Sequence, residues 1–136
     1  MRTLTNVDAE WPYGLETTST RPQLATEEIA SRLGIEAGVA LQHSTIKCLE
    51  PGGRSAMLVL SWWKGRRRPH ARPHASFVAE LGVVRLPEEQ AHALGLLMDT
   101  VAYRVMRTRL DVHSTPVETA DLILPMDHWT IRLQLS

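Results

Sequence analysis

The chain has 136 residues, 43% of them hydrophobic, which suits a single domain with one core. Fifteen Lys and Arg residues balance fifteen Asp and Glu residues, so no global field attracts the chain to nucleic acid or to a membrane surface. Apolar runs fall short of the roughly 20 residues that a membrane helix needs, and no signal-peptide pattern follows Met1, so we expect a cytoplasmic protein.

Residues 1–23 form a polar N-terminal stretch that contains the breakers Pro12, Gly14 and Pro22. This composition predicts a linker-like segment, and its later part is expected to form an edge strand. Residues 24–136 are expected to make up the folded domain.

A helix is predicted over Thr26–Ile35. Thr26 is a favourable N-cap, two glutamates follow in the first turn, and Gly34 can end the helix in a left-handed conformation. A β-hairpin is predicted next, with strands Ala40–Leu49 and Ser55–Trp63 joined by a turn rich in breakers. The single cysteine, at position 48 in the first of these strands, has no disulfide partner and is expected to be a buried thiol.

A basic run, RRRPHAR, occupies residues 66–72. Its prolines favour a solvated loop, and contact with a partner domain or an anionic ligand is the alternative. Autonomous nucleic-acid binding would need aromatic or helical neighbours that present the charges to phosphates. Arg66, Arg67 and Arg68 are therefore expected to give at most weak, salt-sensitive contact with DNA. A short helix is predicted after this loop, over Phe77–Leu81.

The last part of the chain repeats the helix and the hairpin. A helix is predicted over Pro87–Leu96, with Pro87 at its first position, and hairpin strands over Val101–Asp111 and Pro116–Leu124. A closing strand, His128–Leu135, alternates apolar and polar residues. Because this strand would expose an edge or an apolar stripe around Trp129, we expect a homodimer.

Two ten-residue segments 61 residues apart share one signature. TEEIASRLGI begins at Thr26 and PEEQAHALGL begins at Pro87, and the paired glutamates, an alanine and the Leu-Gly pair match without a gap. A hairpin follows each copy, so the chain contains two copies of one helix–hairpin unit, which we expect to pack against each other. This duplication predicts an α+β fold with a mostly antiparallel sheet and helices on one face.

Established catalytic patterns are not found in the sequence. It contains no GxGxxG, P-loop, HExxH or GxSxG pattern, and none of the six histidines forms a pair with ligand spacing on a predicted helix. We therefore expect no metal site, no cofactor and no catalytic residues.

Polar side chains inside the predicted strands are the candidates for ligand binding. Charges on a half-buried sheet face are costly unless they are paired or solvated, so such residues either line a wet pocket or form ordinary ion pairs, such as Arg107 with Glu118. Arg109 shares a strand face with Arg107, and Asp121 shares a strand with Glu118. The residues selected as effector-binding candidates are His43, Thr45, Lys47, Ser61, Arg107 and Glu118.

The order of six segments resembles one known family. They are the helix ending in LGI, the first hairpin, LPEEQAHALGL, AYRVMRTRLD, TPVETADLILP and DHWTIRLQL. Together, over about residues 24–135, they resemble the UTRA domain, the effector-binding domain of the HutC branch of GntR-type bacterial transcription regulators. The resemblance implies a chorismate-lyase-like α+β fold, dimerisation, and a pocket for a small-molecule effector.

This sequence departs from the family pattern in two ways that affect the expected function. These regulators have an N-terminal winged helix-turn-helix domain, which is not found in these 136 residues, so operator binding by this chain alone is not expected. Members that recognise sugar phosphates commonly carry an R-x-R pair on the first hairpin strand, where this sequence has Thr45 and Lys47. A lysine does not replace a bidentate guanidinium clamp, so a less charged effector is expected.

Two other functions compete with the sensor reading. A lyase of the same fold, acting on a small aromatic carboxylate, would need a general acid or carboxylate clamp in its pocket. A stand-alone interaction module would instead dimerise with full-length regulators and inactivate them.

Overall fold

The computed structural model describes residues 1–65 and 76–134, so the basic run at 66–72 lies outside the described residues. Within them the chain forms eight strands and two helices. The elements in chain order are β1 (Arg2–Leu4), β2 (Leu15–Leu24), α1 (Glu27–Leu33), β3 (Ala40–Leu49), β4 (Ser55–Trp63), β5 (Ser76–Arg85), α2 (Glu88–Leu94), β6 (Val101–Leu110), β7 (Pro116–Pro125) and β8 (Trp129–Ile131). None of the described helices is long and apolar enough to cross a membrane.

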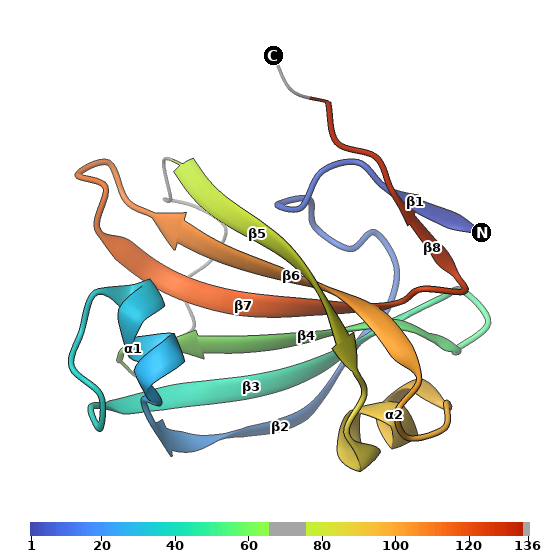
Figure 1. Ribbon diagram of the computed structural model, residues 1–136, viewed down its shortest axis with the longest axis horizontal. Helices are drawn as coiled ribbons and strands as arrows, with labels where there is room; N and C mark the ends of the chain where they lie inside the picture. The colour runs from blue at the N-terminus through green and yellow to red at the C-terminus, as the bar shows by residue number, and fades with distance from the viewer. Residues whose placement is uncertain (66–75, 135–136) are drawn as a thin grey trace.

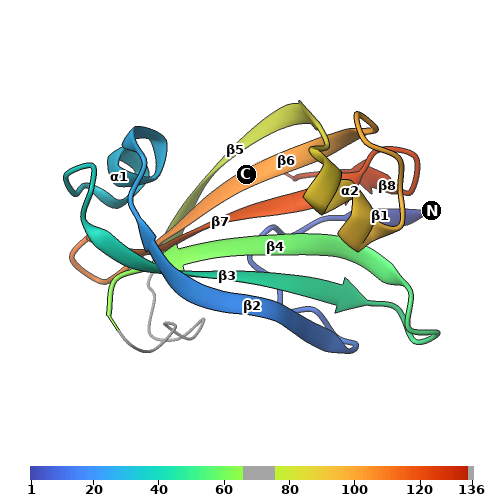
Figure 2. The same ribbon diagram turned by 90° about the horizontal axis from the view of Figure 1, so that it is seen from below.

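The main sheet has six strands in the order β2-β3-β4-β7-β6-β5, and all of its neighbouring strands are antiparallel. The order consists of two strand–helix–hairpin units that meet at β4 and β7 (Figure 1). The predicted α+β fold with a mostly antiparallel sheet is therefore confirmed. The two helices lie at opposite ends of the molecule in Figures 1 and 2.

Both helices are capped much as the sequence predicts. The hydroxyl of Thr26 accepts a hydrogen bond of 3.2 Å from the backbone N–H of Ile29, and Gly34 and Gly95 end the helices with φ of 66° and 69°. Only glycine adopts this left-handed conformation without a steric penalty. Pro87 is the N-cap of α2 rather than its first helical residue, so the helix begins one position later than predicted.

The segment predicted as a short helix at Phe77–Leu81 is instead part of strand β5, so that prediction was wrong. Ten residues of β5 pair with β6, in register from Ser76 opposite Leu110 to Arg85 opposite Val101. A five-residue helix offers few hydrogen bonds, whereas the ladder provides pairing along the whole segment. The valines of β5 also favour an extended chain.

The closing strand is shorter than predicted and lies elsewhere. β8 covers only Trp129–Ile131 and pairs in parallel with β1, outside the main sheet. Trp129 is buried, and its ring N–H donates a 2.9 Å hydrogen bond to the carbonyl of Ala56. The predicted exposed stripe around Trp129 was therefore wrong, because the N-terminal segment covers it.

Different segments of the chain cover the two faces of the sheet. On one face α1 packs on Leu41 and Trp62, and α2 packs on Leu58 and Ile123. On the other face the N-terminal segment and β8 cover a second apolar cluster, which includes the buried Cys48. Residues 1–23, expected to be linker-like, thus contribute β1 and most of β2, which is the expected edge strand.

Candidate functional site

A cluster of charged side chains is buried on the sheet face that the N-terminal segment covers. Alternation along β6 places Arg107 and Arg109 on this face, and β7 places Glu118 directly opposite Arg109. Ser61 comes from the neighbouring strand β4. The side chains of Arg107, Arg109 and Glu118 are only 5%, 8% and 1% exposed. We refer to these four residues as the arginine cluster.

Glu118 is the centre of the arginine cluster. Its Oε1 lies 2.8 Å from Nη1 of Arg109 and 3.5 Å from Nη2 of Arg107. The hydroxyl of Ser61 donates a hydrogen bond to the other carboxylate oxygen, Oε2. Three predicted site residues, Ser61, Arg107 and Glu118, are therefore brought together.

The N-terminal segment closes the arginine cluster with a second carboxylate. Oδ1 of Asp8 lies 2.9 Å from Nε of Arg109 and 3.9 Å from Nε of Arg107. Arg107 also donates a 3.4 Å hydrogen bond from Nη1 to the carbonyl of Val7, whose side chain is buried. The Asp8 side chain is 14% exposed, which places it at the rim of the cluster.

Stability alone does not explain these charges. Desolvating buried ions is costly, and well-packed apolar residues often serve as well or better. The first half of the duplicated fold illustrates this: the 61-residue offset aligns Arg107, Arg109 and Glu118 with Ile46, Cys48 and Met57. All three of those residues lie in the apolar core. The second half therefore carries a specialised polar site where the first half carries a hydrophobic one.

A cavity of about 420 Å³ lies under the N-terminal segment on the same face. Its apolar walls include Trp11, Tyr13, Met57, Leu122 and Trp129. Asn6 and Ala9, which flank Val7 and Asp8 in the sequence, also line this cavity. The cavity thus adjoins a segment that contacts two arginines, and its lining combines apolar side chains with polar groups, a combination typical of small-molecule sites.

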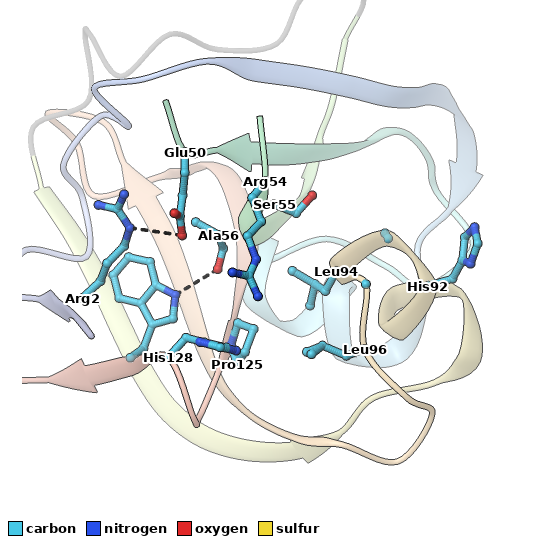
Figure 3. A pocket seen from close by; sticks show the side chains of 13 residues that line it. Arg2, Glu50, Arg54, Ser55, Ala56, His92, Leu94, Leu96, Pro125 and His128 are labelled. Atoms are coloured by element: carbon cyan, nitrogen blue, oxygen red, sulfur yellow. Dashed lines mark hydrogen bonds and ion pairs between the residues drawn. The ribbon is translucent and has the colours of Figure 1, made fainter. Parts of the chain in front are cut away.

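A second cavity of about 320 Å³ lies near α2, and Figure 3 shows it from close by. Arg2, Arg54, His92 and His128 supply basic groups around apolar side chains such as Leu94. Glu50 forms a 3.6 Å ion pair with Arg2. Because Arg54, His92 and His128 are exposed, water solvates their polar groups, which therefore bind a ligand less strongly than buried groups do.

The other three predicted site residues lie on the opposite, helix-covered face. His43, Thr45 and Lys47 alternate along β3 and are separated from the arginine cluster by the sheet. Lys47 lies 4.0 Å from a carboxylate oxygen of Glu16 on the neighbouring edge strand. The six predicted residues therefore belong to two faces of one sheet.

A separate ionic group attaches α1 to the second half of the fold on the helix-covered face. Asp121 accepts from Arg32 at 2.6 Å and from Arg104 at 3.2 Å. Glu28, whose side chain is 57% exposed, bridges the same two arginines at 2.7 and 2.6 Å. Asp121 and Glu118, three positions apart on β7, therefore point to opposite faces.

Burial lowers the pKa of His43, and the hydrogen bond to the carbonyl of Ser61 only partly opposes this effect. The ring stacks on Trp62 with centroids 4.6 Å apart, and its Nδ1–H donates over 3.0 Å. Below a pH of about 6.5 His43 takes up a proton in the unfolded chain, whereas its lowered pKa opposes protonation in the folded chain. The free energy of unfolding should therefore decrease as the pH falls through this range.

We expect His43→Gln to flatten this pH dependence, because glutamine does not titrate. Urea unfolding of the wild type and the variant at pH values from 5 to 8 measures the slope. Identical slopes for the two proteins would show that His43 does not control the pH dependence.

Sequence reasoning missed Asp8 and did not select Arg109. Aligning the two halves of the duplication would have found Arg109, since it replaces a buried cysteine. For Asp8 the sequence offered no signal, because its role depends on how an irregular segment folds back over the sheet.

A scan against protein-family models finds no match, and neither does a search of the curated proteins. Solved structures do match. A GntR-family transcriptional regulator has a TM-score of 0.77 at 23% identity, and the match covers 90% of this chain and 58% of that protein. The ligand-binding domain of a GntR-family regulator from Bordetella bronchiseptica has a TM-score of 0.76 at 17% identity, covering 90% of this chain and 92% of that one.

The effector domain of PhnF from Mycobacterium smegmatis also matches, with a TM-score of 0.71 at 13% identity over 90% of this chain and 86% of that domain. Two of these three structural neighbours are isolated ligand-binding or effector domains, and the third is a GntR-family regulator matched over 58% of its length. The chain therefore has the α+β fold of such domains.

Proposed function

We propose that this chain is the ligand-sensing and dimerisation part of a cytoplasmic transcription regulator of the HutC branch of the GntR family. The observation that carries the proposal is the fold match over nearly the whole length of isolated ligand-binding domains, 92% in the Bordetella bronchiseptica case. The GntR-family regulator with a TM-score of 0.77 is longer than this chain, and the match spans only 58% of its length. DNA recognition is assigned to a winged-helix domain outside these 136 residues.

The arginine cluster is the proposed place of effector binding. Its buried guanidinium groups are held in position by Glu118, and a cavity lies under the same N-terminal segment. Preorganised, desolvated donors recognise polar ligand groups more strongly than exposed ones do. On this reading the domain binds a metabolite without transforming it.

A thermal-shift screen of metabolites tests the sensor function. We expect at least one compound to raise the melting temperature of the wild type by several degrees, as ligands that bind only the folded state do. Arg109→Gln should abolish that shift. Lys47 was selected from the sequence as an effector contact, but it lies on the opposite face of the sheet, so Lys47→Ala should retain the shift and serves as the control. A broad library that stabilises neither the wild type nor Lys47→Ala would contradict a sensing role.

We also propose that the homodimer forms through β5. This ten-residue edge strand exposes Phe77, Val78, Leu81 and Val83 by 40–63%. The opposite edge, β2, is polar and interrupted by a proline and a bulge, which protect an edge from pairing. β5 lacks these protections, and an exposed apolar strand is a template for pairing with a second copy.

Leu81→Lys should convert the dimer into a monomer, because each copy would bring a charge into the strand interface. Sedimentation velocity at micromolar concentration measures the change. Leu97→Lys is the matched control: Leu97 is 84% exposed in the connection between α2 and β6, and its replacement should leave the dimer intact. A monomeric wild type would refute the dimer, and a dimeric Leu81→Lys variant would place the interface elsewhere.

A further inference from the structure

Aromatic side chains gather at the cavity of about 420 Å³ under the N-terminal segment. Of the four Trp, two Tyr and one Phe residues in the chain, Trp11, Tyr13 and Trp129 line this cavity. Met57 and Leu122 add apolar surface from the sheet, and the thioether of a methionine makes favourable contacts with aromatic rings. The cavity therefore offers a ligand a wall that is largely aromatic.

The two tryptophan rings at this cavity are fixed to the sheet. The indole N–H of Trp11 donates a 2.8 Å hydrogen bond to the carbonyl of Leu49 at the end of β3, and that of Trp129 donates over 2.9 Å to Ala56 in β4. Their ring centroids lie 6.2 Å apart, with the planes inclined by 50°. One hairpin thus holds both rings in position, which lowers the entropic cost of binding a ligand against them.

The outer part of the aromatic wall is accessible. Trp129 is buried, whereas Trp11 is half-buried and Tyr13 is 46% exposed. Tyr13 meets Trp11 edge to face, with centroids 5.6 Å apart. The guanidinium of Arg2 lies over these two rings at 5.2 and 5.3 Å, and it forms the 3.6 Å ion pair with Glu50 that Figure 3 shows. Arg2, which also lines the cavity, therefore adds N–H donors beside the rings.

We propose that this cavity binds the planar aromatic ring of a small molecule, with a polar substituent of the ring turned toward Arg2. This inference rests on the proposed sensing function and names the class of its ligand. Aromatic rings that pack edge to face or offset on one another gain more than the buried area alone provides. A saturated ring of the same size buries a similar area without making these contacts.

A ring in this cavity would contact two parts of the fold at once. Asn6, Ala9 and Pro12 belong to residues 5–14, which lie outside the strands, whereas Met57 and Leu122 project from β4 and β7. A ligand between these parts stabilises the arrangement in which the N-terminal segment lies on the sheet. Ligand occupancy is thereby coupled to the position of the N-terminal residues.

Benzamide and cyclohexanecarboxamide test the proposal, because they share one amide and one ring size and differ in the flat aromatic ring. Each is titrated to about 20 mM into isotopically labelled protein while the indole N–H NMR signals are followed. We expect benzamide to shift the signals of Trp11 and Trp129 with a dissociation constant on the order of 1 mM, as suits so small a ligand. The signals of Trp62 and Trp63, which do not line the cavity, should stay unchanged. Cyclohexanecarboxamide should bind at least about threefold more weakly.

Substitutions at two aromatic residues of similar exposure tie the probe to the ring surface. Tyr13→Leu removes a ring from the cavity and should raise the dissociation constant of benzamide by roughly 2–10-fold. Tyr13→Phe keeps the ring and should bind benzamide as the wild type does. Phe77→Leu removes a ring that is 40% exposed from β5 and should leave benzamide binding unchanged. If Tyr13→Leu does not fold, the comparison of the two probes on the wild type decides.

The proposal is overturned if benzamide leaves the signals of Trp11 and Trp129 unshifted, if the saturated probe binds equally well, or if Tyr13→Leu and Phe77→Leu lose equal affinity. Its failure is separable from that of the sensing function. A metabolite without an aromatic ring that stabilises the protein, combined with no benzamide binding, would refute the aromatic site and leave the sensor intact. Benzamide binding without any stabilising metabolite would uphold the aromatic site and count against the sensor.

Discussion

Glu118→Gln is expected to lower the free energy of unfolding by about 3–5 kcal/mol, the usual cost of breaking a buried ion pair. The substitution keeps the size of the side chain but removes the charge that contacts both Arg107 and Arg109. The carboxylate of Asp8, at 3.9 Å from Arg107 and 2.9 Å from Arg109, would still contact both guanidinium groups. Urea unfolding at pH 7 measures the loss.

Glu28→Gln is the matched control for Glu118→Gln. Glu28 also contacts two arginines, Arg32 and Arg104, at distances at least as short. Its side chain is 57% exposed, so water replaces the lost interactions and the cost should be about 0–1 kcal/mol. Similar losses for the two variants would show that burial does not set the energetics of the arginine cluster.

Leu58→Ala should cost about 3–4 kcal/mol, which ranks it beside Glu118→Gln. Leu58 is fully buried in β4, where it packs with Leu86, Ala91 and Leu94 in the core beneath α2. Truncation removes apolar contacts and leaves a cavity that the central sheet strand does not easily collapse to fill.

The control for Leu58→Ala is Leu97→Ala, the same change at a leucine that is 84% exposed. It should change the free energy of unfolding by less than about 0.5 kcal/mol. Denaturant unfolding of both variants separates burial from residue type. A loss below about 1 kcal/mol for Leu58→Ala would contradict the packing of α2 on the sheet.

The duplication explains which parts of the fold were predictable. Helix caps and hairpins are local signals, so α1, α2, β3, β4, β6 and β7 follow from the sequence with small errors at their ends. The segment β5 was misassigned, although the 61-residue offset aligns Ser76–Arg85 with the edge strand Leu15–Leu24. Extending the repeat to include the strand before each helix would have corrected this error.

The pairing of β8 with β1 was beyond local reasoning. The two strands lie at opposite ends of the sequence and have only three residues each, so neither carries a pattern that identifies its partner. The same long-range folding of the N-terminal segment buries Trp129 and removes the original reason for expecting a dimer there. The exposed apolar residues of β5 are the remaining feature that favours a homodimer.

The candidate site was predictable only in part, for a similar reason. Alternation grouped Arg107 with Arg109 correctly, and the suggested ion pair of Arg107 with Glu118 exists but is buried. Alternation within each strand did not show that His43, Thr45 and Lys47 face the helices. The relation between the faces of different strands depends on the sheet register, which only the three-dimensional structure supplies.

The most direct test of the sensor proposal is the location of the bound effector. The compound with the largest thermal shift should be titrated into isotopically labelled protein while backbone amide NMR signals are recorded. We predict that the largest shift changes fall on residues 6–11, 61, 107–109 and 118. Changes confined to the cavity near α2, around His92 and Leu94–Leu96, would contradict effector binding at the arginine cluster.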